Sequence, residues 1–343
     1  MRASGGEMNI WLTTSCNMSC RYCYERKNIS EEKNMSQEMA EKVLLYIEPF
    51  IKPEDNIVFH GGEPLLNFPV MKFFTEEFLQ KYPRIKFGFT TNGTVWNDNI
   101  RTFLMKYREH YEGGISVSID GDKETHNGNR VMRNREESYE TVIHTIQELR
   151  EIFTEVRGRM TISADSVNHT SESVKHLFSL GLNPISHAFD LSDKNWDSSK
   201  MCVAEKEYKE IYAFWKEHKD LDISFIDELR YRKKLGRCEG SINIYPNGDI
   251  YPCMEVAGNT AYKMGDVEGG IDRDSWQRIK KRFLKDNESC ERCVQKENCI
   301  HNRCKLINAQ LTGNEELPAK AGCTLEHVKH RFYMKYKGEG FLN

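Results

Sequence analysis

Short runs of apolar and β-branched residues recur through the first 190 residues and alternate with longer segments of helical periodicity. The candidate strands cover residues 8–14, 56–60, 85–91, 115–119, 159–163 and 185–189, and the candidate helices cover residues 36–50, 71–82 and 138–153. Strands that alternate with helices predict βαβ units and a parallel sheet. Six such strands suit a partial (β/α)6 barrel resembling a TIM barrel, although a doubly wound sheet has the same pattern. In either α/β fold, ligands bind beyond the carboxyl ends of the strands.

The pattern changes in the second half of the chain. Residues 191–204 are polar and predict a connection, and residues 206–219 predict a helix. After residue 238 short hairpin-like pieces follow, with Asn247-Gly248 as a two-residue turn signal. The basic, aromatic tail from His327 predicts a solvated terminal helix. We therefore expect a barrel core over residues 1–200, a helical connection over 201–237 and a cysteine-rich domain over 238–343.

Composition narrows the class of protein. The 343 residues are 38% hydrophobic and 29% charged, with a formal charge of −3, which is typical of a soluble globular protein without a nucleic-acid partner. No apolar run approaches the roughly 20 residues that a bilayer span needs, and no signal peptide precedes the first strand. These features predict a cytoplasmic protein with no membrane partner.

The eleven cysteines are unevenly distributed. Three lie within residues 16–23, one is Cys202, and seven follow position 237. Disulfides are disfavoured in reducing cytosol, so this clustering indicates metal binding.

Cys16, Cys20 and Cys23 follow the first candidate strand, and no fourth cysteine or histidine is near them in the sequence. A structural zinc site is closed by four ligands, and His60 could reach such a site only from the next strand end. Three thiolates instead suit a four-iron, four-sulfur cubane with one open iron corner. We therefore favour an iron–sulfur cluster over zinc.

The C-x3-C-x2-C spacing, with Tyr22 before the last cysteine, resembles the signature of the radical S-adenosylmethionine (SAM) enzymes. Further segments that are typical of this family follow in the family's order along the chain, at the ends of the candidate strands. In that family the GGEP segment binds the SAM amino group, residues after the fourth strand contact the ribose and methionine portions, and an arginine binds the carboxylate. The resemblance implies SAM contacts at Tyr22, Gly61, Gly62, Glu63, Pro64, Thr91, Asn92, Ser118, Asp120 and Arg130.

The cysteines after position 237 closely resemble the SPASM extension of radical SAM peptide-modifying enzymes. The resemblance implies two auxiliary [4Fe-4S] clusters, one held by Cys290, Cys293, Cys299 and Cys323 and the other by Cys238, Cys253 and Cys304. In the SPASM pattern three residues usually separate the last two cysteines of the four-cysteine run, whereas four residues separate Cys299 from Cys304 here. A pair of zinc ribbons is the alternative to the two clusters. For the second of these clusters we expect an open iron that a substrate thiolate occupies. The alternative is that a ligand from the protein closes this iron site. That ligand would be Cys202, which is otherwise expected to be a buried and inert cysteine, or an oxygen ligand such as Asp227.

The implied activity is that of a peptide maturase. In the family, the reduced cluster cleaves SAM to methionine and a 5′-deoxyadenosyl radical, which abstracts a substrate hydrogen. We expect a thioether or another cross-link in a ribosomally made precursor peptide. The expected electron donor is a flavodoxin or ferredoxin, and leader recognition is expected from a separate protein or from the barrel surface.

Two other functions compete with the maturase. One is anaerobic sulfatase maturation, which oxidises Cys or Ser to formylglycine. That group carries Asp after the cysteine of its YPCD-like segment, whereas Met254 follows Cys253 here and cannot act as a base. The other function, from a different class, is a zinc-binding scaffold. No residue is assigned as the catalytic base.

Overall fold

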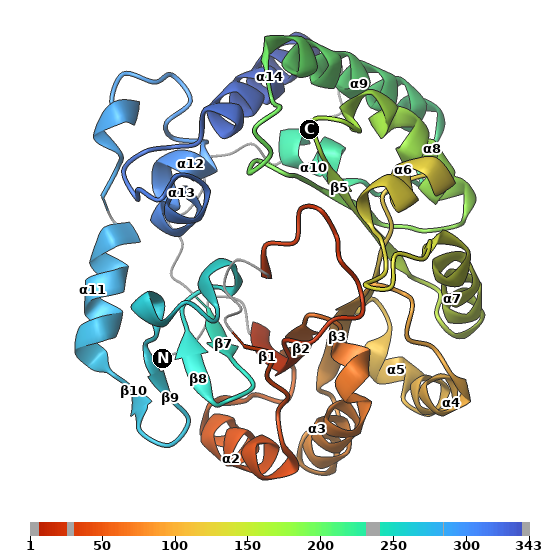
Figure 1. The fold of residues 1–343 in the computed structure, drawn as a ribbon, viewed down its shortest axis with the longest axis vertical. Coiled ribbons are helices and arrows are strands. Elements are labelled where there is room, and N and C mark those ends of the chain that lie inside the picture. Colours follow the sequence, from red (N-terminus) through yellow and green to blue (C-terminus); the bar gives the residue numbers. More distant parts are fainter. Residues whose placement is uncertain (1–6, 26–30, 231–240, 284, 338–343) are drawn as a thin grey trace. The chain divides into compact units, whose positions relative to one another are not determined.

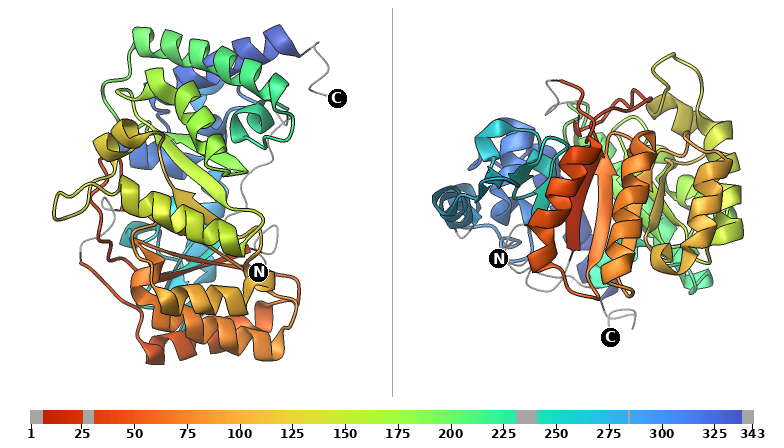
Figure 2. Two further views of the ribbon diagram at one scale, coloured as in Figure 1. Left: turned by 90° about the vertical axis from the view of Figure 1, so that its right-hand side faces the viewer. Right: turned by 90° about the horizontal axis from the view of Figure 1, so that it is seen from below.

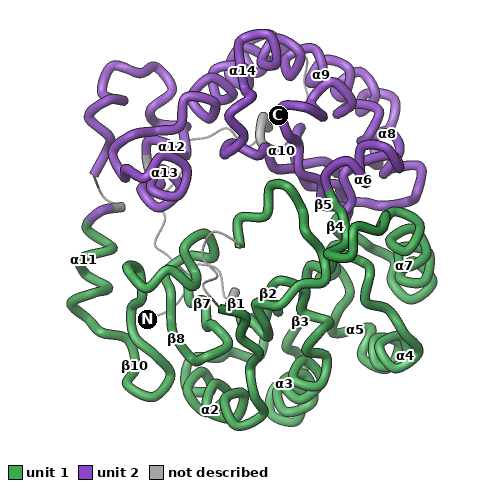
Figure 3. The backbone as a smooth tube through the Cα atoms, in the orientation of Figure 1, with its two compact units in different colours: residues 1–118, 130–156, 239–281 green, residues 119–129, 157–238, 282–343 purple. Residues whose placement is uncertain are grey.

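The computed structural model describes residues 7–25, 31–230, 241–283 and 285–337 (Figure 1). The chain forms two compact units, each assembled from separate segments (Figure 3). Unit 1 comprises residues 1–118, 130–156 and 239–281, and unit 2 comprises residues 119–129, 157–238 and 282–343. Both units combine segments from the two ends of the chain, and the division at residues 200 and 238 stays a prediction.

Unit 1 is built on a mixed sheet. Its parallel strands are β1 (Glu7–Thr13), β2 (Asn56–Gly61), β3 (Lys86–Thr91) and β4 (Ile115–Ser118), in that order. On the other side of β1, strand β7 (Ile242–Ile244) pairs in parallel, so the cysteine-rich half of the chain extends the sheet. The edge continues antiparallel through β8 (Asp249–Tyr251), β9 (Gly265–Asp266) and β10 (Gly270–Ile271).

Strand β1 is buried on both sides, since Ile10, Trp11 and Leu12 all have 0% exposure. Such a continuous apolar run is typical of a central parallel strand. Two helices, α2 (Gln37–Ile47) and α3 (Phe68–Lys81), lie side by side along one face of the sheet (Figure 2). Stacked rings join the layers, because Phe59 of β2 lies 5.8 Å from the Phe87 ring of β3 and 6.2 Å from the Phe74 ring of α3. This packing fixes the strands whose carboxyl ends carry the predicted motifs.

Further helices complete the described part of unit 1. They are η1 (Glu48–Phe50), η2 (Pro64–Asn67), α4 (Asp98–Lys106), α5 (Arg108–Tyr111), α7 (Tyr139–Ile152), η4 (Met254–Val256), η5 (Thr260–Tyr262) and α11 (Arg273–Phe283), which continues into unit 2.

Unit 2 contains the parallel pair β5 (Arg157–Ile162) and β6 (Ile185–Phe189). Its helices before residue 238 are α6 (Lys123–Asn129), η3 (Val167–His169), α8 (Thr170–Ser179), α9 (Ser198–Glu217) and α10 (Ser224–Arg230). Those after it are η6 (Glu288–Cys290), α12 (Ile300–Arg303), α13 (Lys305–Thr312) and α14 (Lys320–Tyr336).

The six predicted strands are confirmed, with ends shifted by one or two residues, and so is the α/β class with its large parallel sheet. The predicted connection over 191–204 is wrong after residue 197. Helix α9 already begins at Ser198, because the Asp197 side chain accepts a 2.9 Å hydrogen bond from the Lys200 amide and caps the helix.

Two further predictions on the second half need correction. The terminal helix exists as α14, but one of its faces is buried: Phe332 packs 5.7 Å from the Tyr208 ring of α9. The Asn247-Gly248 turn is part of a three-residue loop, because the Tyr245 amide bonds to the Asp249 carbonyl. Gly248 supplies the positive φ of 83° that this loop needs. Among the described helices, none combines the length and apolar character that a bilayer crossing requires.

Candidate functional site

The loop after β1 carries Cys16, Cys20 and Cys23, which are all half-buried. A second loop of unit 1 braces it from the side. The Ser19 amide donates to the Val131 carbonyl at 2.7 Å, and the Arg133 amide donates to the Asn17 carbonyl at 2.9 Å. The first cysteine loop is therefore held by backbone hydrogen bonds to a segment more than 100 residues away in the sequence.

The thiol of Cys16 has a defined set of donors. Its sulfur accepts from the Met18 amide at 3.4 Å and from the Asn92 side-chain amide at 3.6 Å. The pKa of Cys16 is raised to about 11, mainly by burial and in part by the nearby charges of Glu63 and Cys20. A thiolate here therefore needs a compensating cation, and iron of the cluster implied by the family would supply it. The donor set and the neighbouring thiol fit the cluster.

The glycine pair after β2 is packed against this loop. A Cβ atom on Gly61 would lie 2.2 Å from the Thr13 carbonyl oxygen, and one on Gly62 would lie 2.5 Å from that of Ser15. The Gly62 and Glu63 amides donate to these same two carbonyls at 3.1 and 2.9 Å. Only glycine permits this close approach, which fixes the predicted SAM-binding segment to the cysteine loop.

Glu63 is fully buried, and protein donors already engage its carboxylate. Oε1 accepts from the Leu65 amide at 3.1 Å and from Thr91 Oγ1 at 2.9 Å, and Oε2 accepts from the Asn92 amide at 2.6 Å. Burial raises the pKa of Glu63 to about 7, while these donors lower it. In this structure the side chain therefore orders the ends of β2 and β3, and a direct contact with the SAM ammonium stays a prediction.

Asn92 links that carboxylate to the first cysteine. While its backbone amide donates to Glu63, its side chain donates to the Cys16 sulfur and, at 2.8 Å, to Asn17 Oδ1. Asn17 in turn donates to Thr94 Oγ1 at 2.8 Å. Sequence reasoning missed Asn17, because an asparagine between cysteines has no spacing signal of its own.

The structure brings together two of the predicted SAM contacts, since the Arg130 guanidinium lies 5.2 Å from the centre of the Tyr22 ring. This distance is within the range of a cation–π contact. Ser118 ends β4 in unit 1. Asp120 belongs to unit 2, where it is buried and accepts from the Thr161 amide at 2.9 Å.

A buried carboxyl near the first cysteine loop also escaped the sequence reasoning. Glu25 accepts from Trp11 Nε1 at 3.2 Å, and Trp11 stacks on His60 with ring centres 4.7 Å apart. Burial raises the pKa of Glu25 to about 7, and the charge of Glu255 raises it further. A lone Glu after a cysteine motif has no pattern that would predict this burial.

The cysteines of the predicted full-ligation auxiliary set gather in unit 2. Burial raises the pKa of Cys323, and the nearby charges of Cys290 and Cys293 raise it further. Cys299 behaves alike: burial raises its pKa to about 11, and Cys323 adds to this effect. Four thiols from three segments are thus close enough to interact electrostatically.

The loop between Cys293 and Cys299 contains Gln295, which is 1% exposed. Neither amide atom of Gln295 has a hydrogen-bond partner among the described residues. Such a buried orphan amide is expected where a further polar group belongs. An iron–sulfur cluster, whose sulfur atoms accept hydrogen bonds, fits this surrounding.

The described predicted ligands of the other auxiliary cluster belong to different units. Cys238 lies outside the described residues, Cys253 belongs to unit 1, and the buried Cys304 of unit 2 caps α13 by accepting from the Ile307 amide at 3.5 Å. Cys202 is exposed on α9, so its predicted burial is wrong. In the described ranges, no three Cys, His, Asp or Glu side chains converge on the position of a single metal ion. The cluster assignments therefore rest on order, spacing and the local contacts above.

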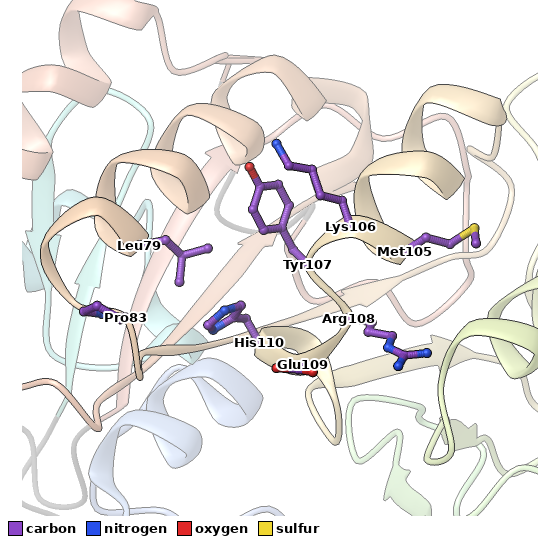
Figure 4. Close-up of a pocket in the computed structure, with 8 residues that line it drawn as sticks. All are labelled: Leu79, Pro83, Met105, Lys106, Tyr107, Arg108, Glu109 and His110. Atoms are coloured by element: carbon purple, nitrogen blue, oxygen red, sulfur yellow. The ribbon is translucent and has the colours of Figure 1, made fainter.

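A cavity of about 400 Å³ in unit 1 lies away from these motifs (Figure 4). It is formed where the chain enters β3 and around the junction of α4 and α5, at the amino ends of the strands. None of its lining residues belongs to the predicted site: Leu79, Pro83, Met105, Lys106, Tyr107, Arg108, Glu109 and His110.

Comparison with known proteins identifies the core. Residues 11–164 match the Radical SAM superfamily. The cysteine-type anaerobic sulfatase-maturating enzyme of Clostridium perfringens is 21% identical over 316 residues, which are 82% of this chain and 84% of that protein. The radical SAM cyclopropyl synthase TigE of Paramaledivibacter caminithermalis is 20% identical over 83% of this chain and 65% of TigE.

Solved structures show the same fold. The structure of native anSMEcpe with bound AdoMet covers 98% of both chains at 18% identity, with a TM-score of 0.80. Streptococcus suis SuiB bound to precursor peptide SuiA covers 93% of this chain and 75% of SuiB at 18% identity, with a TM-score of 0.64. The matched residues include the cysteine loop and the glycine-rich strand end described above. Residues 11–164 therefore form a radical SAM domain, and the chain as a whole is similar to anaerobic sulfatase-maturating enzymes and to the cyclopropyl synthase TigE.

Proposed function

We propose that this enzyme matures a ribosomally made peptide, abstracting a side-chain hydrogen and forming a thioether or another cross-link. The observation that carries the proposal is the group of four interacting thiols that follows the radical SAM domain, at Cys290, Cys293, Cys299 and Cys323. Two structural neighbours support a peptide substrate, because SuiB binds precursor peptide SuiA and anSMEcpe binds the Cp18Cys peptide.

At the core, Cys16, Cys20 and Cys23 would hold three irons of a [4Fe-4S] cluster. When bound, this cluster and SAM supply the 5′-deoxyadenosyl radical that abstracts the substrate hydrogen. The chain itself provides order: the Asn92 amide donates to the Cys16 sulfur, and Glu63 holds the Asn92 backbone. We propose that SAM is contacted by the residues that the family resemblance implies, which are Tyr22, Gly61, Gly62, Glu63, Pro64, Thr91, Asn92, Ser118, Asp120 and Arg130.

We infer a SPASM domain with two auxiliary clusters. Cys290, Cys293, Cys299 and Cys323 would give one cluster full ligation, while Cys238, Cys253 and Cys304 would leave the other with an open iron. The exposure of Cys202 on α9 supports the open site over closure by that thiol. An open iron can bind a substrate cysteine as a thiolate, which places sulfur for attack by a carbon radical. Asp227 is the alternative ligand.

Anaerobic sulfatase maturation is the second candidate. The similarity to the Clostridium perfringens enzyme, over 82% of this chain, favours it. Against it stands Met254, which follows Cys253 in the YPCM segment and packs against the apolar cluster around Trp11. A thioether side chain cannot accept a proton there. The zinc-scaffold alternative is set aside, because the chain carries a radical SAM domain.

The two enzyme activities leave different products on one peptide. The reconstituted enzyme is incubated anaerobically with SAM, reductant and cysteine-bearing peptides, and the products are analysed by mass spectrometry. Cross-linking removes two hydrogens and keeps the sulfur, whereas formylglycine formation from cysteine removes two hydrogens and also replaces the sulfur with oxygen. We expect the first product with a cognate peptide. Sulfur loss as the main outcome would contradict the proposal and favour sulfatase-type maturation.

The partners of this activity are also proposals. The electron for SAM cleavage would come from a flavodoxin or ferredoxin, and leader recognition would come from a separate protein or from the barrel surface. Reduction of the reconstituted enzyme by a purified flavodoxin system, followed by 5′-deoxyadenosine formation, would test the donor.

A further inference from the structure

Helix α13 (Figure 1) begins at Lys305. The Lys305 side chain is buried, with 1% exposure. Lysine is almost never fully buried unless it is paired, because removing an ammonium group from water is costly. A methionine would fill similar space without that cost. The charge at this position therefore calls for an explanation other than packing.

Two side chains receive the Lys305 ammonium. It donates to Asn287 Oδ1 and, at 2.7 Å, to Glu316 Oε2. Asn287 is neutral, and Glu316, the ion-pair partner of Lys305 among the described residues, is 49% exposed, so water screens its charge. A positive charge thus stays inside unit 2, only partly compensated.

Asn287 connects this charge to the thiol group. It is fully buried, and its backbone is fixed because the Cys290 amide donates to its carbonyl at 2.9 Å. Its side chain is fixed too, because Nδ2 donates to the His301 carbonyl at 2.9 Å. Lys305 thus bonds to the side chain of the residue whose carbonyl accepts the Cys290 amide, and these contacts tie the buried ammonium to the backbone at the first cysteine of the group.

We propose that Lys305 raises the reduction potential of the iron–sulfur cluster held by Cys290, Cys293, Cys299 and Cys323. Each electron added to such a cluster increases its negative charge, and a buried cation nearby stabilises the reduced form more than the oxidised form. The inference rests on the proposed function, since it requires the auxiliary cluster. It adds that this cluster is poised as an electron acceptor by a residue that is not a ligand.

The test measures midpoint potentials by anaerobic redox titration monitored by EPR. All variants are made in a background with Cys16, Cys20 and Cys23 replaced by Ala, so that only auxiliary clusters respond. The signal of interest is the one lost in Cys299→Ser. Lys305→Met should move its midpoint to a more negative value. Glu316→Gln, which removes the counter-charge at the surface, should move it to a more positive value.

Lys285→Met is the matched control, because Lys285 is 63% exposed and pairs only with the exposed Glu288 at 3.4 Å among the described residues. It should leave the midpoint unchanged. No shift in Lys305→Met with the cluster loaded, or shifts of both test variants in one direction, would overturn the proposal. If Lys305→Met does not load iron, Glu316→Gln decides alone: a positive shift supports the proposal, and no shift overturns it.

Iron and sulfide counts separate this inference from the proposed function. If the parent background holds no cluster that depends on Cys299, the proposed auxiliary cluster fails, and this inference is overturned with it. If the cluster is present and its potential ignores Lys305, only the inference fails.

Discussion

Replacing Glu63 tests whether one buried carboxylate organises the core. Its two oxygens accept from the Leu65 amide, the Thr91 hydroxyl and the Asn92 amide at 2.6–3.1 Å. Glu63→Ala would leave these three donors without their acceptor in a site that is fully buried.

The expected loss follows from the number of donors. A buried donor without a partner costs about 1–3 kcal/mol, so three of them cost at least about 3 kcal/mol, even if water enters the cavity. A typical domain has about 5–15 kcal/mol of stability, so this loss is a large fraction of the total. Glu63→Gln keeps the shape but turns one acceptor into a donor, and should cost about 1–3 kcal/mol.

The assay is urea unfolding of the anaerobically reconstituted enzyme, followed by circular dichroism. Glu268→Ala is the control, because its ion pair with Lys42 is on the surface, where water screens it. We expect the order of stability to be Glu268→Ala, then Glu63→Gln, then Glu63→Ala. A Glu63→Ala variant within about 1 kcal/mol of the wild type would refute the reasoning, since the cost of even one orphaned donor would then be missing.

The same carboxylate predicts a pH dependence. Its pKa rises from 4.5 to about 7 on folding, so the folded state binds the proton more tightly than the unfolded state. Proton binding by Glu63 therefore contributes roughly 3 kcal/mol to the stability of the folded state. This contribution is fully present below pH 4.5 and is lost as the pH rises through 7. Because this loss is as large as the cost of Glu63→Gln, the stability difference between wild type and Glu63→Gln should shrink toward zero across this window, and the stability order given above is expected at its acid end. A difference that stays constant would contradict the raised pKa.

Three further changes address the first cysteine loop. Gly62→Ala would place a Cβ atom 2.5 Å from a backbone oxygen and should cost about 1–3 kcal/mol and lower iron loading, whereas a Cβ on Gly128 meets nothing within 4 Å and Gly128→Ala should load normally. Asn92→Ala removes a hydrogen bond to the Cys16 sulfur and should make the potential of the SAM-binding cluster more negative; an unchanged midpoint would argue against that bond. Arg130→Gln should weaken SAM binding by about 1.5–3 kcal/mol in equilibrium dialysis, and unchanged affinity would rule out the predicted carboxylate contact.

Much of the fold was predictable, because the local sequence pattern of many elements agrees with their place in the folded protein. The strand that includes Ile10 and Leu12 is apolar and short, and it is a central parallel strand. The start of α9 was missed, because Ser198 and Ser199 look like a loop until the capping contact of Asp197 is known. The pairing of β7 with β1 was also missed, since a triplet such as Ile242–Ile244, more than 200 residues away from β1, has no sequence signal for its partner.

The candidate site, like the fold, could be predicted from the sequence only in part. The spacing of the cysteines predicted metal clusters, and the glycine pair could be recognised as a place of close backbone approach. The sequence could not show that Gly62 approaches the backbone of Ser15, or that Asn17 supports Asn92, because these contacts depend on tertiary placement. Buried charges such as Lys305 were invisible for the same reason, since sequence assigns lysine to the surface by default.

The central claim is that Cys16, Cys20 and Cys23 hold the cluster at which SAM is cleaved. The most direct measurement is 5′-deoxyadenosine formation by the variant with all three replaced by Ala, under anaerobic conditions with excess reductant and alongside the wild type. The account predicts that the variant forms no 5′-deoxyadenosine while it keeps the iron and sulfide of the auxiliary clusters. Continued SAM cleavage by this variant would contradict the account, because the radical chemistry would then arise elsewhere in the chain.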